Sequence, residues 1–116
     1  MAATIEEIEV WLGRPLPEPY RAFLAATPAH YLAANDRTLV YGRDCVMERN
    51  ETYESRKYCP GFLMVGDDSG GTALVLSLDE GCVHSVGMGA MTRDCFEAVA
   101  PNFAAWVEAG FPYADE

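Results

Sequence analysis

The pattern of apolar and polar positions predicts a helix near the start of the chain. Three apolar residues recur at helical spacing there: Ile5, Ile8 and Leu12. Thr4 and Glu7 have the spacing of a capping box, in which each side chain accepts a hydrogen bond from the other residue's backbone N–H. Gly13 tolerates the left-handed backbone that often ends a helix. We therefore predict a helix that starts at Thr4 and ends at Gly13.

Two further helices are predicted from apolar faces bounded by proline or glycine. The segment Leu16–Tyr20 contains two prolines, which a first helical turn accepts because their missing N–H groups would have no partner there. The apolar face of this second helix comprises Tyr20, Phe23 and Leu24. Pro28 limits it.

The final helix presents three apolar residues on one face: Phe103, Trp106 and Val107. We expect Pro101 in its first turn, and Gly110 and Pro112 to end it. Phe96 and Val99 are expected in a preceding turn or in a kinked extension of this helix.

The middle of the chain alternates between strand and helix signals. Thr38–Tyr41 predicts a short strand that Gly42 closes. The segment from Val46 to Lys57 is highly polar and contains no glycine or proline, so we expect one solvent-exposed helix.

Three apolar segments then predict strands. Phe62–Val65 and Thr72–Ser77 flank a turn at residues 66–71, and Cys82–Val86 follows a second turn at residues 79–81. Because the first two segments are apolar at successive positions, we expect central strands covered on both faces. These strands form an antiparallel meander. The sequence therefore predicts an α+β fold, with helices packed on an antiparallel sheet, as a single domain over residues 1–116.

Composition narrows the cellular setting. Half of the 116 residues are hydrophobic, which is enough to fold without a metal or disulfide staple. No apolar run is long enough to span a membrane, and the N-terminal segment is acidic where a secretory signal needs positive charge. We expect a cytoplasmic protein whose four cysteines are reduced thiols in or near the core: Cys45, Cys59, Cys82 and Cys95.

The net charge of −10 is unevenly distributed. Residues 61–116 carry nine acids and one base, Arg93, a net charge of −8, whereas residues 1–60 carry nine acids and seven bases, a net charge of −2. Such a field disfavours nucleic acid and anionic lipid as partners and favours a basic protein. Solubility alone is the alternative explanation of the acidity.

Three stretches together resemble the SUKH superfamily of Smi/Knr-like domains. Residues 8–24 (IEVWLGRPLPEPYRAFL) are similar to the family's opening pattern, lE..lG..LP..y..FL. Residues 65–79 are similar to its glycine-rich centre, and residues 99–107 to its ending, iA.sF..fl. The stretches occur in family order. The chain departs from the family at Thr27–Ala29, where many members have Asn-Gly, so contacts through that loop are not carried over.

The resemblance implies a protein that works by binding. Most bacterial members of the superfamily look like immunity proteins that neutralise a toxin, often a nuclease, whereas fungal relatives resemble regulators that act as interaction hubs. Glu9 matches a characteristic family position, where we expect a structural hydrogen bond with a neighbouring loop; a contact with the partner is the alternative. The leading hypothesis is therefore a toxin-neutralising immunity protein, and the alternative is a regulatory or scaffold protein with another client. An enzyme of unknown class is a minor alternative.

Candidate catalytic chemistry is weak. Asp68–Gly71 reads Asp-Ser-Gly-Gly, which echoes a serine protease loop, but Ser69 would need a histidine base and a buried acid. Only His30 and His84 are present, in a loop and a strand respectively. The acidic pairs of the two turns lie at opposite ends of the meander and cannot share one metal ion. We predict no catalytic residues, no metal and no cofactor.

Acidic residues in three places are the candidate partner-binding residues. They comprise one pair in each of the two turns and three glutamates along the predicted polar helix: Asp67, Asp68, Asp79, Glu80, Glu48, Glu51 and Glu54. The turn carboxylates are expected to stay solvated and to steer a basic toxin domain toward the surface. A merely solvated face is the alternative for the three glutamates.

Overall fold

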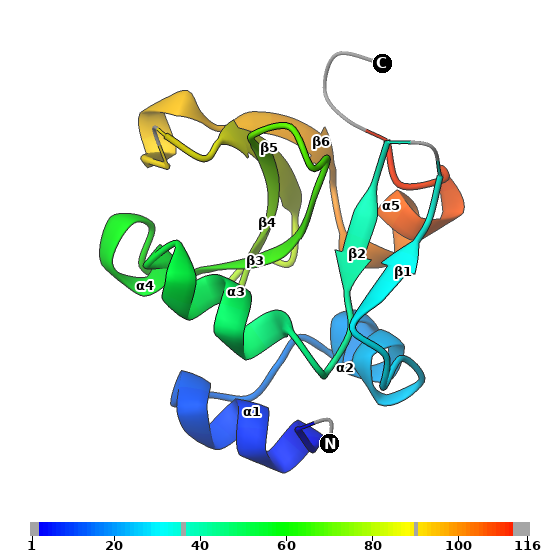
Figure 1. Ribbon diagram of the computed structural model, residues 1–116. Coiled ribbons are helices and arrows are strands. Elements are labelled where there is room, and N and C mark those ends of the chain that lie inside the picture. Colours follow the sequence, from blue (N-terminus) through cyan, green and yellow to red (C-terminus); the bar gives the residue numbers. More distant parts are fainter. Residues whose placement is uncertain (1–2, 36, 90, 113–116) are drawn as a thin grey trace.

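A computed structural model describes residues 3–35, 37–89 and 91–112, which form a six-stranded antiparallel sheet with helices around it (Figure 1). The strands are β1 Tyr31–Ala33, β2 Leu39–Tyr41, β3 Phe62–Asp67, β4 Thr72–Ser77, β5 Val83–Gly87 and β6 Glu97–Ala100. The helices are α1 Ile5–Leu12, α2 Glu18–Ala25, α3 Val46–Thr52, α4 Ser55–Tyr58 and α5 Phe103–Glu108, and a 3₁₀ turn spans Arg93–Cys95. Each strand pairs with its neighbours in chain order, which confirms the predicted α+β class and its central meander.

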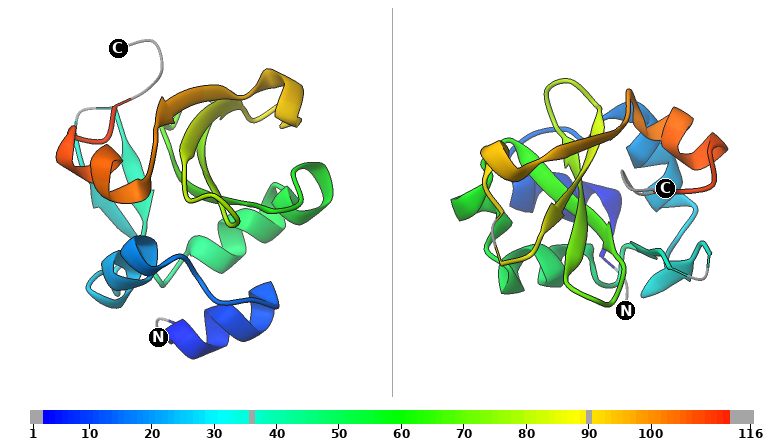
Figure 2. Two further views of the ribbon diagram at one scale, coloured as in Figure 1. Left: turned by 180° about the vertical axis from the view of Figure 1, so that it is seen from behind. Right: turned by 90° about the horizontal axis from the view of Figure 1, so that it is seen from above.

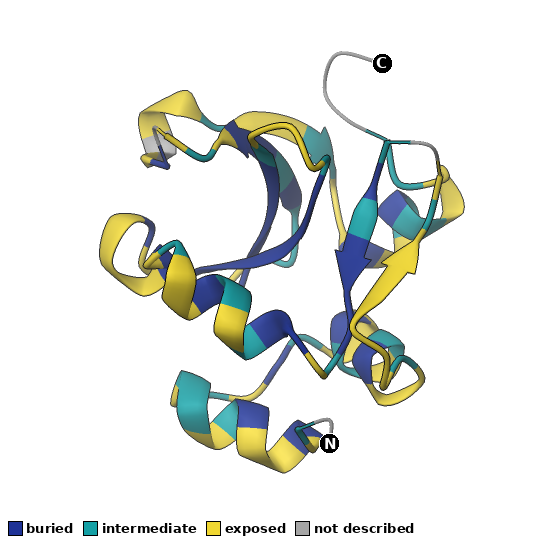
Figure 3. Cartoon of the chain, viewed as in Figure 1, coloured by how far each residue is buried: buried dark blue, intermediate teal, exposed yellow. Residues whose placement is uncertain are grey.

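The two central strands are covered on both faces, as their continuous apolar runs predict. All six residues of β3 are buried, and only Thr72 of β4 is partly exposed (Figure 3). Helices α3 and α4 contact β3, while α5 contacts β6 and α2. The sheet is strongly bent, as the curved strands in Figure 2 show. No helix in the described part of the chain is long and apolar enough to cross a membrane.

The first helix forms as its capping box dictates. The Thr4 hydroxyl accepts a hydrogen bond from the Glu7 backbone N–H, and the Glu7 carboxylate accepts one from the Thr4 backbone N–H. Gly13 ends the helix with φ of 82°. Glu9 then accepts a hydrogen bond of 2.8 Å from the Leu16 N–H, so its carboxylate fixes the loop between α1 and α2. This contact confirms the structural role predicted for Glu9.

The polar segment after β2 differs from its prediction. It forms two helices, α3 and α4, separated by a break at Glu54, whose φ is 53°. Its inner side is buried through Val46, Asn50 and Ser55, so the segment is a covering layer of the sheet and not a fully exposed helix. After the break, Ser55 lies beside Asn50, and its hydroxyl donates a hydrogen bond to the Asn50 amide oxygen.

Asn50 explains how this covering layer is attached to the sheet. Its amide group donates to the Met64 carbonyl oxygen at 3.0 Å, and its amide oxygen accepts from the Met64 N–H at 2.8 Å. Strand β2 pairs with β3 only at Asp67 and Gly66, so the Met64 backbone groups meet a side chain in place of a strand. Met64 and Gly66 also flank a bulge in the pairing of β3 with β4. A buried amide thus completes the edge of β3 where β2 stops.

Two strands are missing from the sequence prediction. Residues 97–100 form β6, so Val99 is in an extended strand, and neither the turn nor the kinked helical extension predicted for it is present. Pro101 precedes the N-cap of α5, Asn102, whose side chain accepts a hydrogen bond from the Ala105 N–H. Strand β1 has only three residues, all exposed, and forms because it pairs with β2.

The cysteines divide between core and surface. Cys45 and Cys59 are buried, as predicted, and burial raises the pKa of each thiol to about 11. Cys82 is half-buried. Cys95 is exposed, contrary to the prediction of a core or near-core thiol, because it lies in the 3₁₀ turn before the edge strand β6.

We expect Asn50→Ala to lower the free energy of unfolding by about 2–4 kcal/mol, because it leaves the buried N–H and carbonyl of Met64 without partners. Urea denaturation measures the loss. The exposed neighbour Glu51→Ala is the control and should change the free energy by less than about 0.5 kcal/mol. A loss for Asn50→Ala as small as that of the control would contradict the anchoring role.

Candidate protein-binding site

A hollow of about 260 Å³ lies where α3, the edge strand β1 and the β3–β4 turn meet. It is lined by Tyr31, Leu39, Arg49, Tyr53, Asp67, Ser69, Gly71 and Met88. The hollow therefore unites one residue of the predicted acidic turn with side chains from the segment that carries Glu48, Glu51 and Glu54. Its lining comes from four separate stretches of the chain, which only the tertiary fold brings together.

Asp67 is the buried acid of this hollow. Only 7% of its surface is exposed, and it is the last residue of β3 and not part of a solvated turn as predicted. The Tyr41 hydroxyl donates a hydrogen bond of 2.5 Å to Oδ2, and the Ser69 N–H donates one of 2.9 Å to Oδ1. The ladder continues through Asp67, which pairs with Leu39 and Ala73, so the side chain lies over the sheet and not in solvent.

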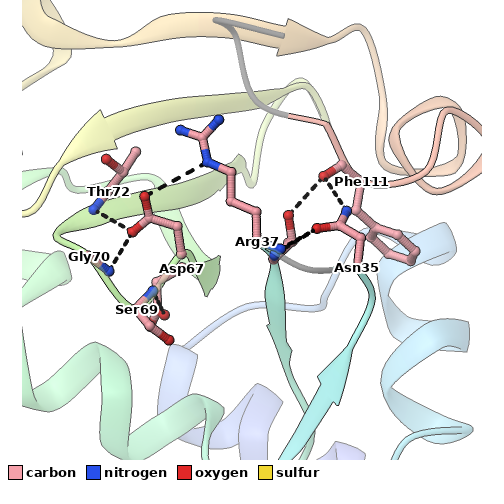
Figure 4. A network of polar contacts seen from close by, with 9 residues as sticks. Asn35, Arg37, Asp67, Ser69, Gly70, Thr72 and Phe111 are labelled. Atoms are coloured by element: carbon pink, nitrogen blue, oxygen red, sulfur yellow. Dashed lines mark hydrogen bonds and ion pairs between the residues drawn. The ribbon is translucent and has the colours of Figure 1, made fainter.

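Asp68 organises the turn that follows. Its Oδ1 accepts hydrogen bonds from the Gly70 and Thr72 N–H groups at 2.7 and 3.1 Å. Figure 4 shows Gly70 and Thr72 in this turn, beside Asp67 and Ser69. Arg37 approaches its other oxygen at 3.9 Å. Gly71 has positive φ, as the turn predicts, but the other left-handed residue is Ser69 and not Gly70. Asp68 is therefore partly occupied in holding its own loop.

The α3 side of the hollow carries a neutralised ion pair. The guanidinium of Arg49 contacts both carboxylate oxygens of Glu48 at 2.8–3.2 Å. It also lies 5.5 Å from the centre of the Tyr53 ring. The hydrogen bonds from Arg49 and Thr52 lower the pKa of Glu48 below its usual value. Glu48 is thus engaged within the molecule, although its side chain is half exposed.

The other predicted acids lie apart from the hollow's floor. Asp79 forms an ion pair of 2.8 Å with Arg14 beside a second hollow, at the β4–β5 turn. Glu80 is exposed next to it. Glu54 is paired with Lys57 at 3.5 Å. The prediction that the two acidic turns occupy opposite ends of the meander agrees with the strand order, since successive turns of a meander alternate between its ends.

The side chains around Ser69 do not form a catalytic arrangement in the described residues. His84 pairs with Val75 in the middle of β4, and its ring lies against Phe62 and Phe96. His30 lies 3.6 Å from Asp44 and stacks edge-on against Tyr31. Neither imidazole contacts Ser69, whose recorded hydrogen bond is from its backbone N–H to Asp67. Among the described residues, no group of three or more acidic, cysteine or histidine side chains could hold a metal ion.

Sequence reasoning identified Asp67 but missed the side chains that surround it. Tyr31 is 38% exposed on β1, and its ring centre lies 6.2 Å from that of Tyr41. Tyr53 and Arg49 belong to the segment that was considered only for its glutamates. Tyrosine and arginine are enriched among the residues that dominate protein interfaces, which is the one signal that could have drawn attention to them.

Comparison with known protein families gives one match. The model of the SMI1 / KNR4 family (SUKH-1) matches residues 2–109, which include every element of the hollow. No curated protein sequence matches the chain.

We predict that stability declines above about pH 10, in part through Tyr41. Burial, and then the hydrogen bond to Asp67, raise the pKa of Tyr41 above its ordinary value of 10.0. The unfolded chain therefore releases the phenolic proton before the folded chain does, so the contribution is intact below about pH 10 and is lost as the pH rises. Each such group adds a slope of up to about 1.4 kcal/mol per pH unit.

Unfolding of Tyr41→Phe between about pH 10 and 11.5 should show a slope shallower than wild type by about 1 kcal/mol per pH unit. Tyr20 also has its pKa raised by burial and contributes equally to both proteins. The control is Tyr58→Phe, which removes the hydroxyl of a tyrosine that is 51% exposed. Identical slopes for wild type and Tyr41→Phe would show that Tyr41 is not the responsible group.

We also predict that Ser69 is not a nucleophile, because neither histidine contacts it. A fluorophosphonate probe should leave the protein unlabelled under conditions that label a serine hydrolase. Labelling that disappears in Ser69→Ala would overturn this prediction.

Proposed function

We propose, from the premise that the chain belongs to the SMI1 / KNR4 family (SUKH-1), that it is a non-catalytic, single-domain protein-binding module of the cytoplasm. Its most specific role would be that of an immunity protein that neutralises a toxin. The proposed mechanism is occlusion: the module covers the toxin's working surface and performs no reaction on it. The partner is a basic protein domain, since the chain carries a net charge of −10.

The observation that carries this proposal is the composition of the hollow. Its walls present two tyrosines, an arginine and a methionine beside a buried carboxylate. Tyrosine, arginine and methionine are the side chains enriched at the centres of protein interfaces. The hollow is also smaller than the about 300–1,000 Å³ typical of small-molecule pockets. These features favour a protein surface that receives a side chain over an active site that encloses a substrate.

The acids proposed as partner-binding residues divide into two roles. Glu51 and Glu80 are exposed, and neither carboxylate takes part in an ion pair or hydrogen bond recorded for the described residues, so both are suited to long-range steering. Glu48, Glu54, Asp68 and Asp79 are engaged with arginine or lysine neighbours. They add to the field but would be exchanged or shared on binding. We place Asp67 in direct contact with the partner.

The experiment that tests the proposal first captures the partner protein and then measures whether that partner is toxic. The purified chain is used to capture a protein from the source cell's lysate, and the captured protein is identified by mass spectrometry and expressed in a sensitive host. We expect it to arrest growth, and co-expression of this chain to restore growth. The expected partner is basic and binds in a complex that blocks its activity.

Two outcomes discriminate among the alternatives. A captured partner that is harmless when expressed would contradict the immunity role and support the regulatory or scaffold alternative. Turnover of a captured protein or small molecule by the purified chain would contradict the non-catalytic role itself.

Association with the captured partner should slow markedly with added salt. Steering raises on-rates by about 10- to 1,000-fold at low salt, and screening shortens the range to about 8 Å at physiological ionic strength. Glu51→Gln/Glu54→Gln should lower the association rate more than Asp79→Asn/Glu80→Gln, because the former pair flanks Tyr53 of the hollow. Surface plasmon resonance at two salt concentrations measures both. An association rate that changes neither with salt nor in either variant would contradict steering, and the acidity would then serve solubility alone.

A further inference from the structure

The hollow beside Asp67 contains one charge that its neighbours do not neutralise. Arg49 is held by both oxygens of Glu48, and Arg37 approaches Asp68 at 3.9 Å. The ion pairs recorded for the described residues include none with Asp67. Its two hydrogen-bond partners, the Tyr41 hydroxyl and the Ser69 N–H, are both neutral. The floor of the hollow therefore presents a negative charge without a counter-ion.

Asp67 also retains capacity for further hydrogen bonds. Each oxygen of an ionised carboxylate offers two acceptor positions, and each oxygen of Asp67 uses one. The remaining positions are available on a residue that is only 7% exposed and lines the hollow. A buried carboxylate is costly unless it is well paired, so a cation that reaches it gains more than it would at the surface.

The walls of the hollow suit the same kind of guest. Tyr31 and Tyr53 place aromatic rings at its sides, and Met88 adds an apolar surface. Aromatic rings attract a cation placed over their faces, and they also pack against the methylene groups of arginine and lysine. A volume of about 260 Å³ is of the size that a single long side chain fills, and is below the range typical of small-molecule ligands.

We propose that this hollow is a receptor for one basic side chain of the protein partner, with Asp67 as its counter-ion and Tyr31 and Tyr53 as its walls. Arginine is the preferred guest, because its planar fork can donate to both oxygens of a carboxylate at once and can stack on an aromatic ring. Tyr41 is a positioning residue: its hydroxyl fixes the Asp67 carboxylate toward the hollow. This inference rests on the proposed protein-binding function and names the contact that such a partner makes.

The test uses a probe that does not depend on the partner. The full chain, labelled with ¹⁵N, is titrated with N-acetyl-arginine amide and followed by NMR, and N-acetyl-norleucine amide serves as the uncharged control. We expect saturable shifts at the backbone amides of Ser69, Gly71 and Tyr31 with the arginine probe alone. N-acetyl-lysine amide should bind more weakly at the same amides.

Three variants assign the charge that binds the probe. Asp67→Asn keeps the shape of the side chain and removes its charge: the amide oxygen can still accept from the Ser69 N–H, and the amide NH2 can donate to the Tyr41 hydroxyl oxygen. It should weaken binding by about tenfold or more. Arg49→Gln should strengthen it, because Glu48 then adds an unneutralised charge beside the hollow. Glu18→Gln should leave binding unchanged, because Glu18 is exposed and lies between two prolines that line the other hollow, at the β4–β5 turn and so at the opposite end of the meander. The opposite signs expected for Asp67→Asn and Arg49→Gln exclude a general loss of folding as the cause.

The outcomes separate this inference from the proposed function. Binding of the arginine probe that is equal in wild type and Asp67→Asn, or shifts confined to other surfaces, would overturn the receptor while leaving a captured partner valid. Equal binding of the norleucine probe would show an apolar hollow and overturn the receptor too. Arginine binding that depends on Asp67 would support the receptor even where the captured partner proves harmless, since it measures the hollow alone.

Discussion

The position of α3 against β3 depends on one buried amide. Where β2 stops pairing, the Met64 N–H and carbonyl would be left buried without partners, and Asn50 supplies both hydrogen bonds. Because Arg49 and Tyr53 flank Asn50 on the same helix and its C-cap, this attachment also fixes the α3 wall of the hollow. Asp67 ends the strand whose backbone Asn50 completes. The fold and the candidate binding site are thus set by the same interaction.

The charge of the chain is arranged differently from its distribution along the sequence. Most of the bases tie elements together: Arg14 binds Asp79 and the Leu78 carbonyl, and Arg43 binds backbone carbonyls of residues 3, 24 and 25. The guanidinium of Arg56 lies over the Trp11 ring and donates to the Trp11 carbonyl. Several of the acids form ion pairs with these and other arginines. The local charge at Asp67, which no described base neutralises, therefore differs in kind from the general acidity.

Local sequence signals predicted the elements that local physics determines. The side chains of Thr4 and Glu7 cap the start of α1. The continuous apolar runs of β3 and β4 indicated strands buried on both faces, and both strands are buried. Strands β1 and β6 lack such a signal, because each exists only by pairing with a neighbour. The break at Glu54 is accompanied by a hydrogen bond from the Ser55 hydroxyl to the Asn50 side chain. No glycine or proline marks this position, so the sequence did not predict the break.

The sequence predicted only part of the candidate site, because local signals indicate the aspartates but not the tertiary contacts around them. The two aspartates after Gly66 look alike in sequence, and both were expected in solvent. The strand extends two residues beyond its apolar run, and a bulge near Met64 and Gly66 interrupts the alternation of its faces, which together place Asp67 inside and leave Asp68 to hold the turn. Tyr31, Arg49 and Tyr53 join it only through the tertiary fold.

Hydrogen–deuterium exchange of the chain alone and in its complex with the captured partner tests the central claim most directly, because it maps the covered surface without a substitution. The account predicts slower exchange at residues 31–33 of β1, in the segment from Arg49 to Tyr53 and in the turn at residues 68–71, all of which border the hollow. Protection confined to α1 and α2, or to the β4–β5 turn beside Asp79, would contradict it.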